Sequence, residues 1–257
     1  MLEKFLGKAK WRAERFGGNV AKLGLLPAIS FELNWILNKE RIFVNVPNCP
    51  QPLVMRRHST DPAVFTQIFI HEELRIETPE APKVIIDGGA YVGYSAVFFA
   101  RQFPNAKIIA IEADYANFQL LQRNCSVFKN VDCLYGALWN KKAYLHIRNP
   151  EDPPWAYQIE ECAESVQTSI PSLSIKELIN DYNLQTINIL KLDIEGAEKF
   201  IFHTGAFEDW LPSVRAALIE VHGNDAEQAV INAFNQFKFN SSKLGEKLYF
   251  INPSVPT

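Results

Sequence analysis

The sequence lacks the features that mark secreted proteins, proteins with structural zinc sites and membrane-spanning proteins. Its 257 residues include only four cysteines, with no CxxC pair and no zinc-ligand spacing. No apolar run approaches the roughly 20 residues that a membrane-spanning helix needs, and Met1–Leu26 lacks the apolar core and cleavage site of a signal peptide. These absences predict a cytoplasmic protein with reduced thiols and no transmembrane segment.

The sequence also lacks a large excess of charge of either sign. The chain carries 26 Lys and Arg against 29 Asp and Glu, a formal net charge of -3. No global basic field would draw it to nucleic acid, so we predict no nucleic-acid partner. With 47% hydrophobic and 21% charged residues, the composition predicts a folded α/β protein with a sizeable core.

The amino-terminal region differs from the rest of the chain. Its first 22 residues carry six basic side chains and place apolar residues on one face of an expected helix. That helix could pack on its own domain, pack on a partner in a homodimer, or make weak contact with a membrane surface. The helix-breaking stretch Glu77–Pro82 separates an accessory, substrate-side region, residues 1–80, from a second domain, residues 81–257.

From Lys83 onward, strand and helix patterns alternate. This order predicts a mostly parallel sheet covered on both faces, with a ligand at the carboxyl ends of its strands. The tail predicts an antiparallel hairpin. Expected strands cover residues 84–87, 107–112, 131–138, 144–147, 187–193 and 216–222, and expected helices cover 94–102, 114–125, 174–182, 197–203 and 225–237, the last capped by Asn224.

The first strand leads into a glycine-bearing loop, "DGGAYVG", residues 87–93. A dinucleotide fingerprint needs glycine at the middle position, where this chain has Ala90, followed by the bulky Tyr91. Asp87 would also repel a pyrophosphate at the helix N-terminus. These residues weaken the alternative of an NAD-type oxidoreductase and favour a cationic ligand. S-adenosylmethionine fits, because it carries a sulfonium and an ammonium but no phosphate.

Two further positions favour a nucleoside site. Glu112 ends the second strand, near the spacing at which an acid accepts hydrogen bonds from ribose hydroxyls. The alternative is that Asp87 only caps its helix and Glu112 is solvated. Ala137, at the end of the third strand, is where an adenine would lie against backbone and small side chains.

A second group of charges lies in "LKLDIEGAEKF", residues 190–200. Charge at the carboxyl tip of a central strand is costly unless it is paired or used. Strand alternation places Lys191 and Asp193 on one face, either as a mutual ion pair or as groups that orient the methyl donor or acceptor. Glu195 is a candidate for the ammonium of the cofactor or for a bound cation.

His222 ends the next expected strand, on the same side as Glu220. Because its ordinary pKa lies near neutrality, it could take a proton from an acceptor hydroxyl, or it could make only a structural hydrogen bond. A metal held by Asp193, Glu195 and His222 is a further alternative. The favoured prediction makes His222, Asp193 and Lys191 catalytic and requires no metal.

Four segments in order carry a family resemblance: "VIIDGGAYVGYSAVFFA", "IIAIEADYANFQLLQRN", "ILKLDIEGAEKFIFHTGA" and "ALIEVHG". Together they resemble the FkbM-type family of S-adenosylmethionine-dependent methyltransferases. The resemblance implies a class I methyltransferase fold, Rossmann-like, with a seven-stranded sheet whose final strand is antiparallel. By motif position, the resemblance implies that the cofactor is bound by Asp87, Gly89, Tyr91, Gly93 and Glu112. It implies that the reaction cleft is lined by Lys191, Asp193, Glu195 and His222.

The resemblance also implies a reaction class. Such enzymes methylate hydroxyls on sugars, glycans or natural products, so we expect O-methylation of a small-molecule or glycan acceptor. N-methylation of a peptide or small molecule is one alternative, and a catalytically inactive cofactor-binding module is another. The polar segment Asn149–Val166, with Trp155 and Tyr157, is expected to act as a lid or as a packing element. The chain departs from the family in "DGGAYVG", where members more often have "DIGANVG".

Overall fold

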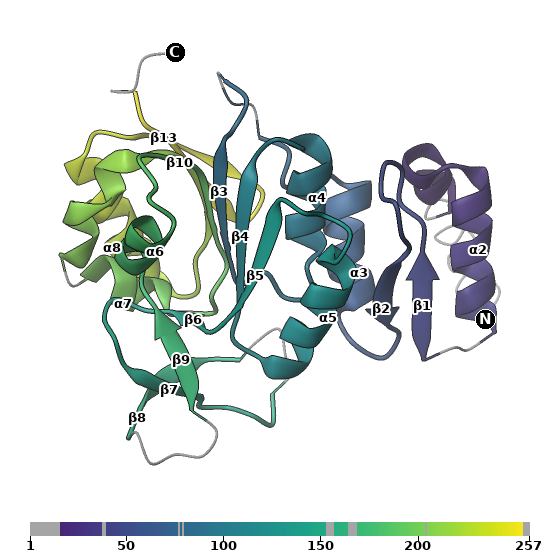
Figure 1. The fold of residues 1–257 in the computed structure, drawn as a ribbon, viewed down its shortest axis with the longest axis horizontal. Helices are drawn as coiled ribbons and strands as arrows, with labels where there is room; N and C mark the ends of the chain where they lie inside the picture. Colours follow the sequence, from purple (N-terminus) through teal and green to yellow (C-terminus); the bar gives the residue numbers. More distant parts are fainter. Residues whose placement is uncertain are drawn as a thin grey trace, which may run out of the picture. The chain divides into compact units, whose positions relative to one another are not determined.

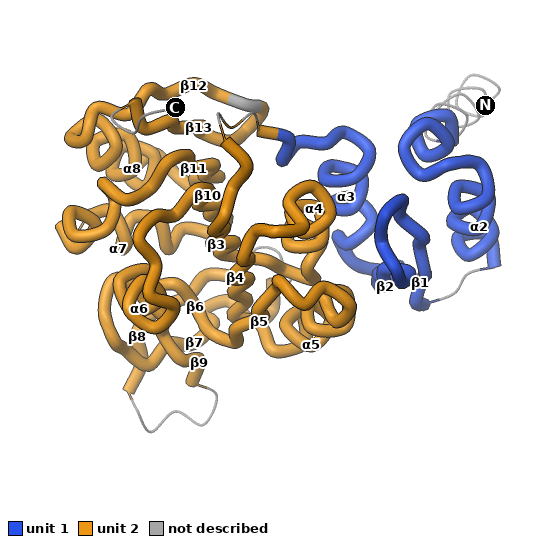
Figure 2. The backbone as a smooth tube through the Cα atoms, turned by 45° about the horizontal axis from the view of Figure 1, so that its top comes forward, with its two compact units in different colours: residues 1–75 blue, residues 76–257 orange. Residues whose placement is uncertain are grey.

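A computed structural model describes residues 16–37, 40–76, 78, 80–152, 157–163, 169–203 and 205–253. The chain divides into two compact units, residues 1–75 and 76–257 (Figure 2). The substrate-side role expected of residues 1–80 stays a prediction. Most of the expected basic helix, and Trp155, lie outside the described residues. Within the described part, no helix has both the length and the apolar character that crossing a bilayer requires.

The first unit is a small α+β structure. A helix, α2 (Leu25–Ile36), precedes an antiparallel hairpin of β1 (Arg41–Val44) and β2 (Leu53–Arg56). A short helix, α3 (Asp61–Phe65), continues into the π-helical turn η1 (Thr66–Ile70). The fully buried carboxylate of Asp61 accepts hydrogen bonds from the backbone and guanidinium of Arg56, which ties α3 to the end of the hairpin.

The second unit is built on a seven-stranded sheet with the order β12-β13-β11-β10-β3-β4-β5 (Figure 1). Five strands run parallel, and β13 is antiparallel to both of its neighbours. This confirms the predicted parallel sheet with a carboxyl-terminal antiparallel hairpin. The strands are β3 (Val84–Gly88), β4 (Lys107–Glu112), β5 (Val131–Tyr135), β10 (Ile187–Leu192), β11 (Val214–Glu220), β12 (Asn240–Leu244) and β13 (Lys247–Ile251).

Helices cover both faces of this sheet, as expected from the alternation of patterns. Figure 1 shows α4 and α5 on one side and α6, α7 and α8 on the other. The helices are α4 (Tyr94–Gln102), α5 (Tyr115–Cys125), α6 (Ile175–Asp181), α7 (Glu198–His203) and α8 (Asn224–Gln236), with 3-10 turns η3 (Ala206–Asp209) and η4 (Leu211–Ser213) before β11. The predicted cap of α8 is wrong. Gly223, with φ 96°, precedes the helix, and Asn224 is already its first residue.

A second, four-stranded sheet was not predicted. It has the order β6-β9-β7-β8, with β6 (Ala137–Leu138), β7 (Tyr144–Ile147), β8 (Ile159–Cys162) and β9 (Ile170–Leu173). Only β7 was expected as a separate strand, and β8 lies inside the segment expected to act as a lid or as a packing element. The predicted strand 131–138 is broken at Gly136, where a Cβ would lie 2.8 Å from the carbonyl oxygen of Pro171.

A buried ion pair joins the carboxyl ends of the two central strands. Lys191 of β10 lies opposite Asp87 of β3 in the parallel register, and its Nζ is 3.2 Å from Asp87 Oδ1. Asp87 is 0% and Lys191 4% exposed. Burial alone would lower the pKa of Lys191, but the carboxylates of Asp87, Asp193 and Glu220 together outweigh it and raise that pKa above its usual range. The second carboxylate oxygen of Asp87 accepts a hydrogen bond from Ser95 Oγ at 2.6 Å.

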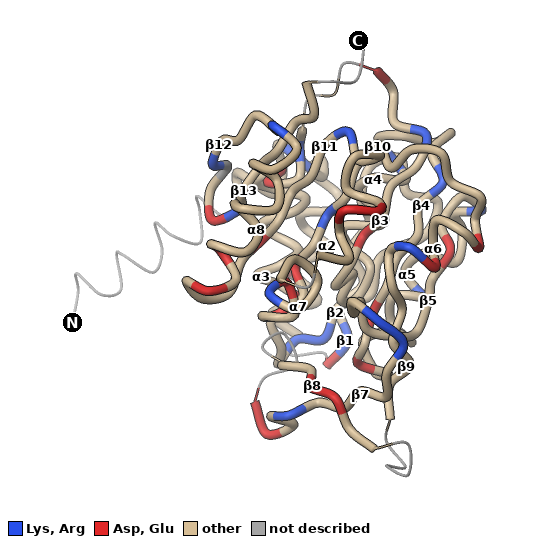
Figure 3. The backbone as a smooth tube through the Cα atoms, turned by 90° about the vertical axis from the view of Figure 1, so that its left-hand side faces the viewer, with Lys and Arg blue, Asp and Glu red and all other residues tan. Residues whose placement is uncertain are grey.

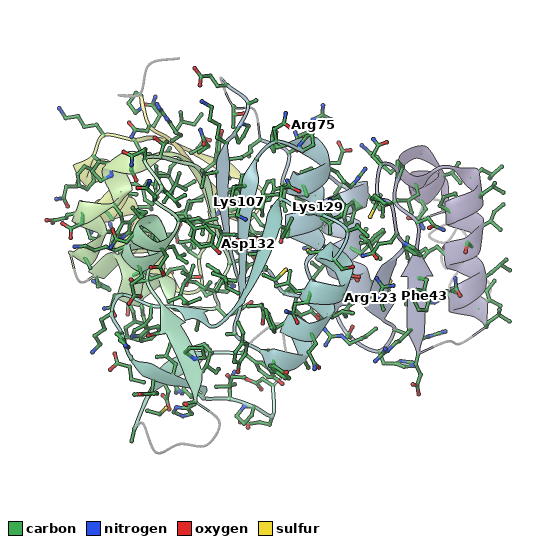
Figure 4. The ribbon with its side chains drawn as sticks, viewed as in Figure 1. Phe43, Arg75, Lys107, Arg123, Lys129 and Asp132 are labelled. Atoms are coloured by element: carbon green, nitrogen blue, oxygen red, sulfur yellow. The ribbon has the colours of Figure 1, made fainter. Side chains whose placement is uncertain are left out.

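An exposed ion pair lies at the opposite edge of the same sheet. Lys107, the first residue of β4, has its Nζ 2.6 Å from Oδ1 of Asp132 on β5 (Figure 4). Each side chain is 36% exposed, so solvent screens the pair. Exposed pairs of this kind contribute at most about 1 kcal/mol to stability.

We expect these two ion pairs to respond differently to loss of their lysine. Lys191→Met leaves the carboxylate of Asp87 buried without a countercharge, which should lower the free energy of unfolding by about 3–5 kcal/mol. Lys107→Met should lower it by less than about 1 kcal/mol. Urea denaturation followed by circular dichroism measures both. The double variant Asp87→Asn/Lys191→Met should recover most of the loss, and equal losses in the two single variants would contradict the assignment.

Candidate active site

The glycine loop between β3 and α4 packs directly against the chain that leaves β10. Gly89 has φ +72°, and a Cβ there would lie 1.7 Å from the carbonyl oxygen of Asp193. Gly93 has φ +89° and faces Leu121 of α5, whose Cδ1 would lie 2.9 Å from an added Cβ. Tyr91 is also left-handed, with φ 51°. The glycines of this loop therefore allow close protein packing at both of its ends.

The loop directs most of its N–H groups inward. Gly89 and Ala90 both donate to the carbonyl of Ile111, at 3.1 and 2.9 Å, and Gly93 donates to Ala90 at 2.8 Å. Tyr91 donates to Oε2 of Glu112 at 2.9 Å. These four N–H groups are therefore engaged within the protein and offer little to the carboxylate of a bound cofactor. The same hydrogen bonds weaken the NAD alternative, because these four groups cannot also cradle a pyrophosphate.

Glu112 lies at the carboxyl end of β4 with 8% of its surface exposed. Its Oε1 accepts hydrogen bonds from the N–H of Asp114 at 2.9 Å and the amide of Asn117 at 3.4 Å. Burial outweighs these hydrogen bonds and raises the pKa of Glu112 to about 7. Because each carboxylate oxygen has two lone pairs, Oε2 keeps acceptor capacity beyond its bond to Tyr91. The predicted contact with ribose hydroxyls stays a prediction, as does the adenine contact at Ala137, which is 6% exposed.

Asp87 and Lys191 lie beneath the loop rather than on its surface. Lys191 donates hydrogen bonds to the carbonyls of Gly88 and Gly89, at 3.3 and 2.7 Å, and is closer to Asp87 than to Asp193, whose Oδ2 is 3.9 Å away. The register pairs Asp87 and Lys191 with each other, and both side chains are buried. Their predicted roles in the cofactor site and in the reaction cleft stay predictions. Both side chains position the glycine loop.

Asp193, Glu195 and His222 come together at the same edge of the sheet. They follow β10 and β11, and one donor atom of each lies within 4.8 Å of the others. The Nε2 of His222 is 3.3 Å from Oε2 of Glu195. All three side chains are partly exposed, by 31, 23 and 29%. Glu195 has φ 53°, and Gly196 with φ 96° completes the turn. We call these three residues the carboxylate–imidazole cluster.

Glu198 supports this cluster from below, a role that we had not assigned from the sequence. It begins α7, is fully buried, and its Oε1 lies 3.5 Å from Nδ1 of His222. The same oxygen accepts a hydrogen bond from the N–H of Ile194 at 3.1 Å. The available signal was its position three residues after Glu195, at the start of the expected helix 197–203.

The carboxylates around His222 change its protonation. Burial lowers its pKa, but Glu198 and Glu195 outweigh this and raise the pKa of His222 to about 9. Burial raises the pKa of Glu195 to about 7. His222 therefore carries a proton at pH 7, and it cannot accept another before it loses that one. Its predicted role as the base stays a prediction with this added requirement.

Comparisons with known proteins agree with this architecture. The model of the methyltransferase FkbM domain matches residues 87–248. "Methyltransferase 1" of Beauveria bassiana (strain ARSEF 2860) is 27% identical over 182 residues, which are 58% of this chain and 72% of that protein. "Methyltransferase sdnD" of Sordaria araneosa is 22% identical over 190 residues, 61% of this chain and 73% of that protein.

A solved structure, methyltransferase FkbM from Methylobacillus flagellatus KT, is 14% identical, with a TM-score of 0.48. The alignment covers 72% of this chain but only 47% of that one, so the chain spans less than half the length of that relative. The family model, in contrast, runs from Asp87 at the glycine loop to Leu248 in β13 and thus includes every residue of the candidate site. Because that match spans more than half of the chain, the protein belongs to the FkbM methyltransferase family and is an S-adenosylmethionine-dependent methyltransferase.

Proposed function

We propose that the protein transfers a methyl group from S-adenosylmethionine to a hydroxyl of a small-molecule or glycan acceptor. One observation carries the proposal. The glycine loop and Glu112, on the cofactor side, share the carboxyl edge of the sheet with the carboxylate–imidazole cluster. In open α/β sheets, this edge is where ligands bind.

The residues on the cofactor side fit a nucleoside with a sulfonium. Glu112 retains acceptor capacity for ribose hydroxyls, while the inward N–H groups of the loop offer little to a phosphate. We propose that Glu112, Tyr91 and Ala137 hold the adenosine, with Gly89 and Gly93 shaping the loop and Asp87 fixing it from beneath. When bound, S-adenosylmethionine supplies an electrophilic methyl group next to a positively charged sulfur.

On the acceptor side, the cluster would receive the hydroxyl. Asp193 and Glu195 are acceptors that can orient an O–H, and their partial exposure keeps them within reach of a substrate. In the transfer, the oxygen–carbon bond forms as the carbon–sulfur bond breaks, the electron pair stays on sulfur, and the hydroxyl proton passes by way of the cluster to solvent. Holding the two reactants in line can contribute roughly 7–11 kcal/mol of rate acceleration.

The distribution of charged residues and the free cysteines support the predictions on binding partners and cellular location. Among the residues drawn in Figure 3, basic and acidic segments are interspersed along the chain rather than gathered by sign, which favours a neutral or polar acceptor over nucleic acid. All four cysteines are free thiols, which suits a reducing cytoplasm. Dimerisation and membrane contact of the amino-terminal helix stay predictions.

A transfer assay tests the proposed reaction. We expect the full chain to move labelled methyl from S-adenosylmethionine to a hydroxylated acceptor, with mass spectrometry placing the methyl on oxygen. Removing a group that handles the acceptor proton costs typically 10²–10⁴-fold, so His222→Ala should lower turnover by at least about 10²-fold and leave affinity for S-adenosylhomocysteine within about twofold.

His203→Ala is the matched control, since His203 is an exposed residue of α7 outside the cluster, and its turnover should equal that of the wild type. Methyl found on nitrogen would favour the N-methylation alternative. Tight binding of S-adenosylhomocysteine without transfer to any acceptor pool would favour a binding module, and binding of NAD instead would overturn the cofactor assignment.

Glu112 gives the cofactor side a pH signature. Ribose hydroxyls that donate to its carboxylate stabilise the charged form, so binding should lower its pKa from about 7 and release a proton. The affinity for S-adenosylhomocysteine should therefore rise with pH, level off above about 7.5, and gain about tenfold per unit of pKa decrease. Calorimetry between pH 5.5 and 8 measures this. Glu112→Gln should bind more weakly without that rise, and an identical pH profile in the variant would refute the contact.

A further inference from the structure

The carboxylate–imidazole cluster has the composition of a divalent-cation site. Two carboxylate oxygens and one imidazole nitrogen suit first-row ions such as Mn²⁺, which accept both oxygen and nitrogen ligands. Ligand distances of about 2.0–2.2 Å leave donor atoms no more than about 4.4 Å apart. The three donors already lie within 4.8 Å of one another, so shifts of a few tenths of an ångström would close them around an ion.

Glu198 is an independent observation that points to the same ligand. It is fully buried, yet among the described residues neither its Oε2 nor Nδ1 of His222 has a hydrogen-bond partner. The two side chains nevertheless face each other, with Oε1 3.5 Å from Nδ1. A metal-ligating histidine almost always donates its second ring N–H to a carboxylate or carbonyl, which fixes the ring and raises its basicity. Glu198 stands where that carboxylate is needed.

Charge at this edge favours a cation as well. The carboxylates of Asp193, Glu195 and Glu198 surround one imidazole. The nearest lysine, Lys191, is already paired with Asp87 and lies 3.9 Å from Asp193. The next, Lys247, pairs with Glu220 at 2.7 Å. The described cations near the cluster are thus each engaged by another carboxylate, and a dication would balance the excess negative charge.

The geometry points to a divalent metal site formed by Asp193, Glu195 and Nε2 of His222, with Glu198 positioning the imidazole. Three protein ligands leave open coordination positions, and an acceptor hydroxyl oxygen can occupy one of them. This part rests on the proposed function. The ion would hold the oxygen in place and ease departure of its proton to solvent, while the oxygen–carbon bond forms and the carbon–sulfur bond of the donor breaks. Of the two roles predicted for Glu195, this selects the bound cation.

Mn²⁺ binding tests the site without any acceptor. Full-length protein, stripped with a chelator and dialysed, is titrated with Mn²⁺ alone while electron paramagnetic resonance reports the free ion. We expect one saturable Mn²⁺ per chain. Asp193→Asn and His222→Ala should abolish saturable binding, and Glu198→Gln should weaken it by about 10–100-fold. Glu208→Gln, an exposed acidic control in η3 outside the cluster, should bind as the wild type does.

Two readouts keep the metal site and the methyl transfer distinguishable. Retained affinity for S-adenosylhomocysteine shows that each variant is folded. Saturable Mn²⁺ binding that is lost in Asp193→Asn supports the site even if no acceptor is ever methylated. The proposal is overturned if the wild type binds neither Mn²⁺, Mg²⁺ nor Zn²⁺, if Asp193→Asn and His222→Ala bind as tightly as the wild type, or if chelator-treated protein transfers methyl at the full rate.

Discussion

The candidate site depends on the buried ion pair between Asp87 and Lys191. Two charges without solvent stabilise each other only with good geometry and further hydrogen bonds, and here Ser95 and the carbonyls of the glycine loop supply them. The pair joins β3 to β10 at the point where both strands end. Gly89 then rests on the carbonyl of Asp193. The loop on the cofactor side and the turn on the acceptor side are therefore held at a fixed separation.

This arrangement divides the charges at the sheet edge into two groups. Asp87 and Lys191 are buried beneath the loop and neutralise each other. Asp193, Glu195 and His222 lie partly in solvent. Their negative charge is compensated in part by a protonated imidazole, while Lys191, 3.9 Å from Asp193, is paired more closely with Asp87. The first group fixes the positions of the backbone, and the second group remains able to exchange a proton or a cation for a substrate.

Much of the fold was predictable because the large sheet is buried on both faces. Continuous apolar strands such as Ile187–Leu192, alternating with helical patterns, leave few other interpretations. The small sheet was missed because β8, "IEEC", has two exposed acids and no apolar alternation. The residues of the candidate site were predicted, but which of their side chains pair with each other was not. Strand alternation placed Lys191 beside Asp193 on one strand, whereas its closest carboxylate, that of Asp87, comes from the neighbouring strand, and register between distant strands is not readable from one sequence.

The protonation state of His222 also depends on contacts between distant segments, which one sequence does not reveal. Taken from the sequence, a histidine at a strand tip has a pKa near neutrality and suits a general base. In the fold, Glu198 behind the ring and Glu195 in front of it hold its proton. An imidazole between two carboxylates is a poor base at pH 7, but it becomes a good ligand once a cation replaces the proton on Nε2, because Glu198 then retains the proton on Nδ1. The arrangement that weakens the first interpretation of His222 is the one that a metal site requires.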